Sequence, residues 1–144
     1  MPMTTLTPAE ANRLFYAEHA VDYDATEFCA NAALGQQRLR QALAPALGAL
    51  PPDPRVLDAG GGSGNASRYL FEQGLQPVLV DASAEMGALW RSKASALGYE
   101  PQTQVAELEA FFAEDQRSWD LVVFSSVLHH LEDPGRLLGQ VARR

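Results

Sequence analysis

A glycine-rich turn at residues 60–64 places the tightest constraint on how this chain can fold. Asp58 is followed by Gly60, Gly62 and Gly64 in a D-x-G-x-G-x-G spacing, directly after a short apolar run. Glycine adopts positive φ without strain, and it lets the backbone approach a ligand with no Cβ in the way. We therefore predict a turn from a buried strand into a helix, shaped to hold a nucleotide-like ligand against bare backbone.

The spacing of the glycines argues against two common phosphate-binding motifs. A dinucleotide fingerprint, G-x-G-x-x-G, fails because its third glycine would fall on Asn65 or Ser67. A P-loop requires a lysine directly after the glycines, and none follows them. An acid at Asp58 instead suits a cationic group, such as an ammonium or a sulfonium.

Strands and helices are predicted to alternate along most of the chain. Two helices are expected first, near residues 8–20 and 26–48, and Pro45 is expected to kink or end the second. Strands are then predicted near 55–58, 77–81, 101–105 and 119–124, and helices near 64–73, 83–97, 107–115 and 133–143. Such alternation is typical of an α/β fold with a parallel sheet and crossover helices.

Over about residues 50–144 the chain resembles the class I S-adenosylmethionine-dependent methyltransferases. Its glycine turn is similar to their first motif, and Val78–Asp81 is similar to their second strand, whose terminal acid holds the ribose hydroxyls. The region of Ala106 and Glu107 resembles the segment beside the adenine, although the family often carries Gly-Asp-Ala there. Trp119–Leu131 resembles the fourth strand and the loop after it. The resemblance implies a Rossmann-like sheet that binds S-adenosyl-L-methionine.

The resemblance also implies which residues meet the cofactor. They are Asp58, Gly60, Gly62, Gly64, Asp81, Ala82, Met86, Glu107 and Ser125. Structural alternatives stay open for several of them. Asp58 can simply organise the turn and Asp81 can cap a helix, while Met86 suits the core equally well. Glu107 can be an acid that is favoured at the start of a helix.

His129 and His130 are the general-base candidates, since imidazole titrates near neutrality. In the family the second histidine is often structural, and that alternative stays open. Residues 1–50 are expected to form an N-terminal helical lid or substrate segment ahead of the cofactor-binding core, residues 51–144. Tyr16 and Tyr23 lie in a stretch that resembles the lid of some family members, with core packing as the alternative.

Methyl transfer to a small-molecule acceptor is the activity that the resemblance implies. Residues 124–127 read Phe-Ser-Ser-Val, whereas methyltransferases acting on DNA adenine or protein glutamine carry Asn/Asp-Pro-Pro-Tyr at that place. Two alternatives stay open. One is a non-catalytic cofactor-binding or regulatory subunit derived from a methyltransferase. The other, less favoured because of the failed fingerprint, is a dinucleotide-dependent oxidoreductase.

The composition limits the partners of the chain. A formal net charge of −7 with scattered Lys and Arg predicts no nucleic-acid surface. Cys29 is the only cysteine, so neither an intramolecular disulfide nor a cysteine zinc cluster is expected, and no metal site is predicted. No secretory signal and no apolar run long enough to span a membrane are visible. We therefore expect a cytoplasmic protein without a membrane partner.

Four strands are expected here, whereas the sheet of the family normally has seven. The strand near 119–124 is apolar on both faces, as a central parallel strand would be. An apolar strand at an edge invites pairing with another chain. We therefore expect either a truncated chain or a sheet completed by self-association or a partner chain at this unpaired edge.

Overall fold

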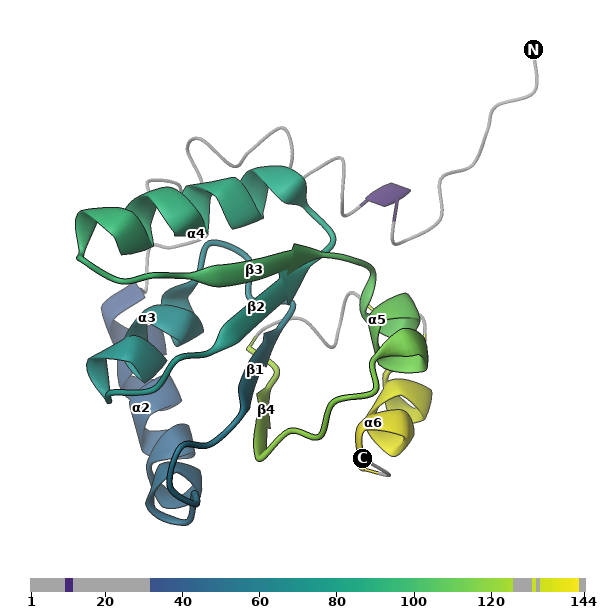
Figure 1. Cartoon of the computed structure of the whole chain (residues 1–144), viewed down its shortest axis with the longest axis horizontal. Helices are drawn as coiled ribbons and strands as arrows, with labels where there is room; N and C mark the ends of the chain where they lie inside the picture. The colour runs from purple at the N-terminus through teal and green to yellow at the C-terminus, as the bar shows by residue number, and fades with distance from the viewer. Residues whose placement is uncertain (1–9, 12–31, 126–130, 132, 143–144) are drawn as a thin grey trace.

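Parallel strands form the centre of the fold (Figure 1). The computed structural model describes residues 10–11, 32–125, 131 and 133–142, and within these residues one four-stranded sheet has the order β3-β2-β1-β4. Its strands are β1 (Val56–Ala59), β2 (Val78–Asp81), β3 (Gln102–Val105) and β4 (Leu121–Val123). All three strand pairings are parallel, which confirms the α/β architecture predicted from the sequence.

Helices precede the sheet and connect its strands. They are α2 (Ala32–Gly48), α3 (Asn65–Glu72), α4 (Ala84–Ala96), α5 (Leu108–Glu114) and α6 (Pro134–Ala142). Each strand and helix after residue 50 lies within two residues of its predicted range. Residues 10–11 are also helical. The rest of the predicted first helix, and the predicted start of the second, lie outside the described residues.

Pro45 does not end α2, which continues to Gly48. Leu43 is buried against the sheet, and Leu47, one turn later, packs against the same apolar cluster. A proline inside a helix removes one hydrogen bond, at a cost of about 3 kcal/mol. We attribute the continuation of α2 to the apolar contacts on both sides of Pro45.

Different helices cover the two faces of the sheet (Figure 1). On one face, which α5 and α6 cover, Leu57, Val80 and Phe112 belong to one apolar cluster. On the other face, Val56 and Leu70 belong to a second cluster, to which α2 and α3 contribute. Successive residues of a strand point to opposite faces of its sheet. The consecutive apolar residues of β1 therefore serve both clusters, and the sheet is buried on both sides.

Two glycines and a capping aspartate mark the ends of three helices. Gly74 and Gly98 adopt φ values of 81° and 82° just after α3 and α4, where left-handed residues commonly end helices. At the start of α6, Asp133 Oδ1 accepts the N–H of Arg136 at 3.0 Å. These residues account for the ends of α3 and α4 and for the start of α6, close to the helix limits predicted from the sequence.

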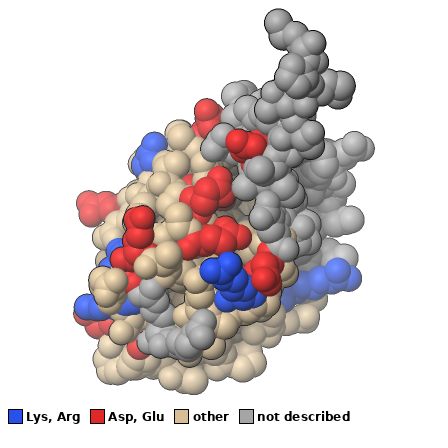
Figure 2. Space-filling model, turned by 90° about the vertical axis from the view of Figure 1, so that its right-hand side faces the viewer, with Lys and Arg blue, Asp and Glu red and all other residues tan. Residues whose placement is uncertain are grey.

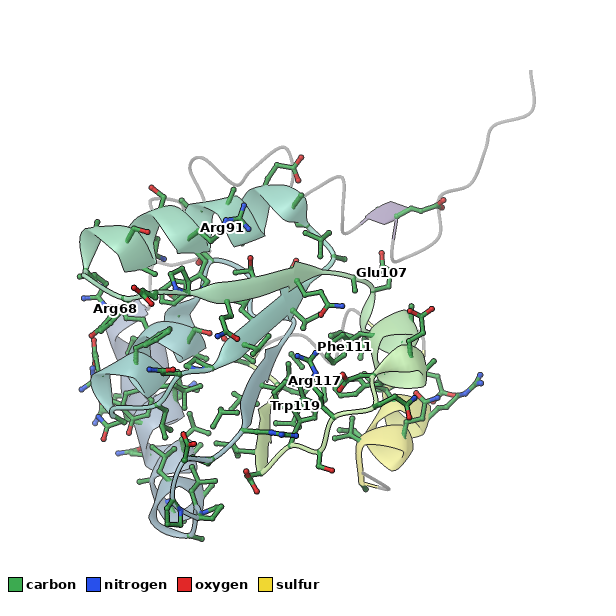
Figure 3. The ribbon with its side chains drawn as sticks, in the orientation of Figure 1. Arg68, Arg91, Glu107, Phe111, Arg117 and Trp119 are labelled. Atoms are coloured by element: carbon green, nitrogen blue, oxygen red, sulfur yellow. The ribbon has the colours of Figure 1, made fainter. Side chains whose placement is uncertain are left out.

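One arginine between two aromatic rings holds the connection from α5 to β4 (Figure 3). The Arg117 guanidinium carbon lies 4.7 Å from the centre of the Trp119 ring and 5.7 Å from that of Phe111. Asp115 accepts hydrogen bonds from Arg117 Nε at 2.7 Å and from Trp119 Nε1 at 2.8 Å. These contacts tie the end of α5 to the residues just before β4, and so support the amino end of that strand.

The two edges of the sheet differ in character within the described residues. β3, at one edge, is largely exposed and polar. β4, at the other, is apolar, with Leu121 and Val122 half-buried and Val123 buried. The predicted pairing of this edge with a second chain stays a prediction. In the part of the chain described, no helix combines the length and apolar character needed to cross a bilayer.

Gly64 joins the start of α3 to the packing of α4. Its φ is 87°, and a Cβ at this position would overlap ring atoms of the fully buried Trp90 indole. We expect Gly64→Ala to lower the free energy of unfolding by about 2–4 kcal/mol, because the left-handed backbone and the overlap both act against the side chain. Urea unfolding followed by tryptophan fluorescence measures this loss.

Gly74→Ala is the matched control at the other end of the same helix. Gly74 has a similar φ, but a Cβ there would meet open space. The backbone effect alone predicts a loss of about 1–2 kcal/mol. If Gly64→Ala and Gly74→Ala lower the free energy of unfolding equally, the packing role of Gly64 is contradicted.

Candidate functional site

The glycine turn lies where the strand order of the sheet reverses. β1 has β2 on one side and β4 on the other, so the chain leaves β1 in one direction and later returns on its opposite side. Open α/β sheets bind ligands in the crevice beyond the carboxyl ends of their strands at such a point. Residues 60–64 follow β1 there, and Ser125 follows β4. The two segments therefore flank the expected ligand crevice.

Hydrogen bonds hold the glycine turn against the end of β2. The Gly60 N–H donates to the Val80 carbonyl at 2.7 Å, and the Gly62 N–H donates to Asp81 Oδ2 at 2.9 Å. Gly60 and Gly62 have φ values of 70° and 56°, in the left-handed region that glycine adopts most easily. The turn therefore has the bare, left-handed backbone that the glycine spacing predicts.

The Asp81 carboxylate links the glycine turn to the start of α4. Besides the Gly62 N–H, it accepts the Ser83 N–H on Oδ1 at 2.8 Å. Ser83 is the residue that caps α4, because its hydroxyl accepts the Met86 N–H at 3.2 Å. Half-buried Asp81 therefore holds the glycine turn and the start of α4 together at the carboxyl end of β2.

Asp58 lies in the interior beneath the glycine turn, and its side chain is fully buried. Ser67 Oγ donates to Asp58 Oδ2 at 2.7 Å, whereas Oδ1 has no hydrogen-bond partner among the described residues. A Cβ on Gly61 would lie 2.7 Å from Asp58 Oδ2 and 2.6 Å from Leu79 Cδ1. The backbone of the turn is therefore packed directly on the carboxylate.

Burial raises the pKa of Asp58 from 3.8 to about 6. Hydrogen bonds from the Ser67 side chain and backbone lower this pKa in part, and the negative charge of Asp81 raises it further. A buried carboxylate with one unpaired oxygen is unfavourable unless a donor or a cation satisfies it. A hydrogen-bond donor or a cation that reached Asp58 Oδ1 would therefore lower the cost of burying this carboxylate.

Gly61, Ser67 and Ser83 belong to the site although the D-x-G-x-G-x-G spacing does not select them. Gly61 is an unspecified position of that spacing, and its contact with Asp58 depends on how the turn folds back. Ser67 is a polar residue at a buried position of α3. The signal for Ser83 is the preference of serine for the residue before a helix.

The predicted residues on and after β2 differ in their exposure. Ala82 is half-buried next to Asp81. Met86 is only 1% exposed, and its Cε lies 3.3 Å from the position that a Cβ on Gly62 would take. Met86 therefore has almost no surface for a ligand, which favours its alternative role as a core residue beneath the turn.

Glu107 and Ser125, two further predicted residues, follow the outer strands β3 and β4. Glu107 is half-buried after β3, and it occupies the N-cap position of α5 without a capping hydrogen bond from its side chain. Ser125 is half-buried after β4.

His129 and His130 lie outside the described residues, as do the predicted lid residues Tyr16 and Tyr23. The described part of the chain contains no group of three or more side chains that could hold a metal ion.

Asp58 is expected to make stability depend on pH. Its pKa is higher in the folded chain, so the folded state binds more protons between about pH 4 and about pH 6, and the free energy of unfolding falls as the pH rises through this window. Asp58→Asn removes this titration. At about pH 7.5 the variant should be more stable than the original chain by roughly 1–3 kcal/mol, and below about pH 4 this advantage should disappear.

Urea unfolding at several pH values measures the difference between Asp58→Asn and the unchanged chain. Ser95→Ala, an exposed substitution that removes no ionisable group, is the control, and its difference should not vary with pH. A difference for Asp58→Asn that is constant from acid to neutral pH would contradict the raised pKa.

Two curated relatives match 61% of this chain each. The tRNA 5-carboxymethoxyuridine methyltransferase of Escherichia coli (strain K12) is 34% identical over 90 residues, which are 34% of that protein. The ubiquinone biosynthesis O-methyltransferase of Xanthomonas axonopodis pv. citri (strain 306) is 30% identical over 88 residues, which are 37% of that protein. The chain thus spans a little over a third of the length of these relatives.

Solved structures share the fold at low sequence identity. Magnesium protoporphyrin IX methyltransferase from Synechocystis PCC 6803, solved with bound SAM, has a TM-score of 0.79 and 23% identity, covering 99% of this chain and 74% of its own. A S-adenosylmethionine-dependent methyltransferase from Clostridium acetobutylicum ATCC 824 has a TM-score of 0.63 and 19% identity, covering 90% of this chain and 52% of its own. These similarities support the Rossmann-like arrangement of the strands and helices.

The family described as "Methyltransferase domain" matches residues 32–144. This match includes α2, the glycine turn, the four strands and α6. Because it covers well over half of the sequence, the chain belongs to this family, and the predicted membership of the class I S-adenosylmethionine-dependent methyltransferases is confirmed.

Proposed function

We propose that this chain binds S-adenosylmethionine and takes part in methyl transfer to a small-molecule acceptor. One observation carries the proposal. The Gly62 N–H donates to Asp81 Oδ2 at 2.9 Å, so the bare backbone of the glycine turn and the acid at the end of β2 form one joined surface. A cofactor with a cationic amino-acid end and a ribose needs these two features side by side.

The residues around the turn fit the parts of S-adenosylmethionine. Asp81 would accept the ribose hydroxyls with its carboxylate, which stands at the carboxyl end of β2 beside the glycine turn. The left-handed glycines allow close approach of the backbone, and the unpaired Asp58 Oδ1 suits a cationic group, directly or through water. Ala82, Glu107 and Ser125 would line the adenine and methionine ends.

The protein's contribution to the reaction would be orientation and exclusion of water. When bound, S-adenosylmethionine supplies a methyl group that its sulfonium already activates. Asp81 and the glycine turn would fix the position of that methyl group against the acceptor, because alignment of reacting atoms lowers the barrier. A general base is needed only for an acceptor that arrives protonated, and His129 or His130 is the proposed group for that role.

A small acceptor is favoured over a nucleic acid by the charge of the chain. The formal net charge is −7, and Figure 2 shows acidic side chains interspersed with fewer basic ones on the face that carries α5 and α6. A nucleic-acid surface normally gathers Lys and Arg. One relative is named for a tRNA nucleoside and the other for ubiquinone biosynthesis, so both kinds of acceptor belong in a screen.

Calorimetric titration with S-adenosylmethionine tests the proposed cofactor. We expect binding to the unchanged chain, and Asp81→Ala should weaken it by about 10–100-fold, because hydrogen bonds to a charged acceptor contribute about 1.5–3 kcal/mol. NAD, titrated in parallel, should not bind. Binding of NAD instead of S-adenosylmethionine would overturn the proposal in favour of an oxidoreductase.

Asp120→Ala is the matched control for the Asp81 substitution. Asp120 Oδ2 also accepts a backbone N–H, from Arg55 at 2.8 Å, but it lies at the amino end of β4, at the opposite end of the sheet. Its removal should leave the affinity for S-adenosylmethionine unchanged. An equal loss in both aspartate variants would indicate general destabilisation and contradict a binding role for Asp81.

Turnover distinguishes an enzyme from a binding subunit. Formation of S-adenosylhomocysteine should rise when an acceptor from a panel of small hydroxyl and carboxyl compounds, or tRNA, is added to the cofactor-loaded chain. Tight cofactor binding with no turnover on any of them would favour a non-catalytic cofactor-binding subunit.

A further inference from the structure

We propose that Ser67 is a positioning residue of the site: its hydroxyl holds one oxygen of Asp58, so that the other oxygen is presented to the cationic end of the cofactor. This inference rests on the proposed binding of S-adenosylmethionine. It concerns a residue one helical turn beyond the glycines, which does not itself need to touch the cofactor.

The geometry around Asp58 carries the inference. Asp58 and Ser67 are both 0% exposed, so no solvent competes for their hydrogen bond. The bond is short, 2.7 Å from Ser67 Oγ to Asp58 Oδ2, while Asp58 Oδ1 is buried without a hydrogen-bond partner in the described part of the chain. Since Gly61 is packed against Oδ2, that oxygen cannot turn toward a ligand without displacing the turn. The free oxygen is therefore the one left for a cationic partner.

The position of Ser67 has no other evident use in packing. The other buried residues of α3 include Ala66, Tyr69 and Leu70, which contribute to the apolar cluster beneath the sheet. Serine is a weak helix former, and a buried hydroxyl is unfavourable unless it is hydrogen-bonded. Its bond to Asp58 explains why a polar residue occupies this buried position.

Among the described residues, the charge of Asp81 acts on Asp58 from the end of the neighbouring strand. Leu79 of β2 and Val123 of β4 lie in register with Asp58 on either side and carry no charge. Burial raises the pKa of Asp58 to about 6, and the Ser67 hydrogen bonds oppose this rise. Loss of the hydroxyl should therefore leave a larger share of Asp58 protonated, and uncharged, in mildly acidic solution.

The test is the affinity for S-adenosylmethionine of the unchanged chain and of Ser67→Ala, at about pH 6 and about pH 8. A hydrogen bond to a charged group contributes enough to raise the proton affinity of Asp58 about tenfold when it is lost. We expect the loss of affinity in Ser67→Ala to be about fivefold larger near pH 6 than near pH 8, where Asp58 is ionised in both chains and only its lost orientation remains. A merely structural role would give the same fold-loss at both pH values, which would overturn the proposal.

A double-mutant cycle with Asp58→Asn isolates the coupling between Ser67 and Asp58 from the titration of other groups. In the Asp58→Asn background, Ser67→Ala should have no further effect on affinity, because a residue that acts through Asp58 has nothing left to act on. Additive losses would contradict the inference. Gly74→Ala, at the far end of the same helix, controls for loss of stability and should bind with unchanged affinity at both pH values.

Two conservative variants keep the test decisive if Ser67→Ala does not fold. Ser67→Thr retains the hydroxyl and should restore the pH profile of the unchanged chain. Ser67→Cys keeps the size but has a weaker donor, so its affinity near pH 6 should fall between those of Thr and Ala. If the affinities near pH 6 do not follow the order Thr, Cys, Ala, the positioning role is wrong. If the unchanged chain binds S-adenosylmethionine at neither pH, the result instead counts against the proposed function.

Discussion

The site depends on a glycine turn that is packed tightly against β1, β2 and α4. Asp58 and Leu79 leave no room for a side chain at Gly61, and Trp90 leaves none at Gly64. The hydrogen bonds from Gly60 and Gly62 to the end of β2 then fix the remaining backbone. Because side chains, helices and strands all meet the same five residues, the turn is part of the core packing as well as the proposed ligand surface.

The buried carboxylate under this turn links stability to binding. Asp58 Oδ1, which has no partner among the described residues, disfavours the folded chain at neutral pH, and in our proposal a cationic ligand supplies the missing interaction. Functional sites often hold groups whose pKa is shifted by burial and neighbouring charge. In our account Ser67 limits the shift and sets which oxygen is free, whereas Asp81 combines a structural role toward Gly62 and Ser83 with a proposed role toward the ribose.

Much of the fold could be predicted from local patterns, because local physics sets the helix and strand limits. Gly74 and Gly98 end helices for reasons of backbone conformation, and Asp133 caps α6 through a hydrogen bond three residues away. The predicted limits of β4 were less accurate than those of the other strands, because strand pairing rather than apolar character decides where a strand ends. Pro45 within α2 shows the same effect, because tertiary contacts outweighed a local helix breaker.

The site was predicted in part, and the missing part is the part made by long-range contacts. The glycine spacing and the acid after β2 identify the turn and Asp81, which the structure joins by a hydrogen bond. The contacts of Gly61 with Leu79, and of Ser67 with Asp58, depend on how the turn folds back over β1, which no spacing rule encodes. The burial of Met86 likewise follows from the packing of α4, so the sequence left its role open.

The most direct test of the central claim is a nuclear magnetic resonance titration of the isotope-labelled chain with S-adenosylmethionine, read at each backbone amide. Our account predicts that the amide signals of Gly60, Gly62, Ser83 and Ser125 change on binding, because they surround the crevice beyond the carboxyl ends of β1, β2 and β4. The signals of Gly74 and Gly98, at the far ends of α3 and α4, should stay in place. Changes that gather away from the glycine turn, or no change at saturating cofactor, would contradict the account.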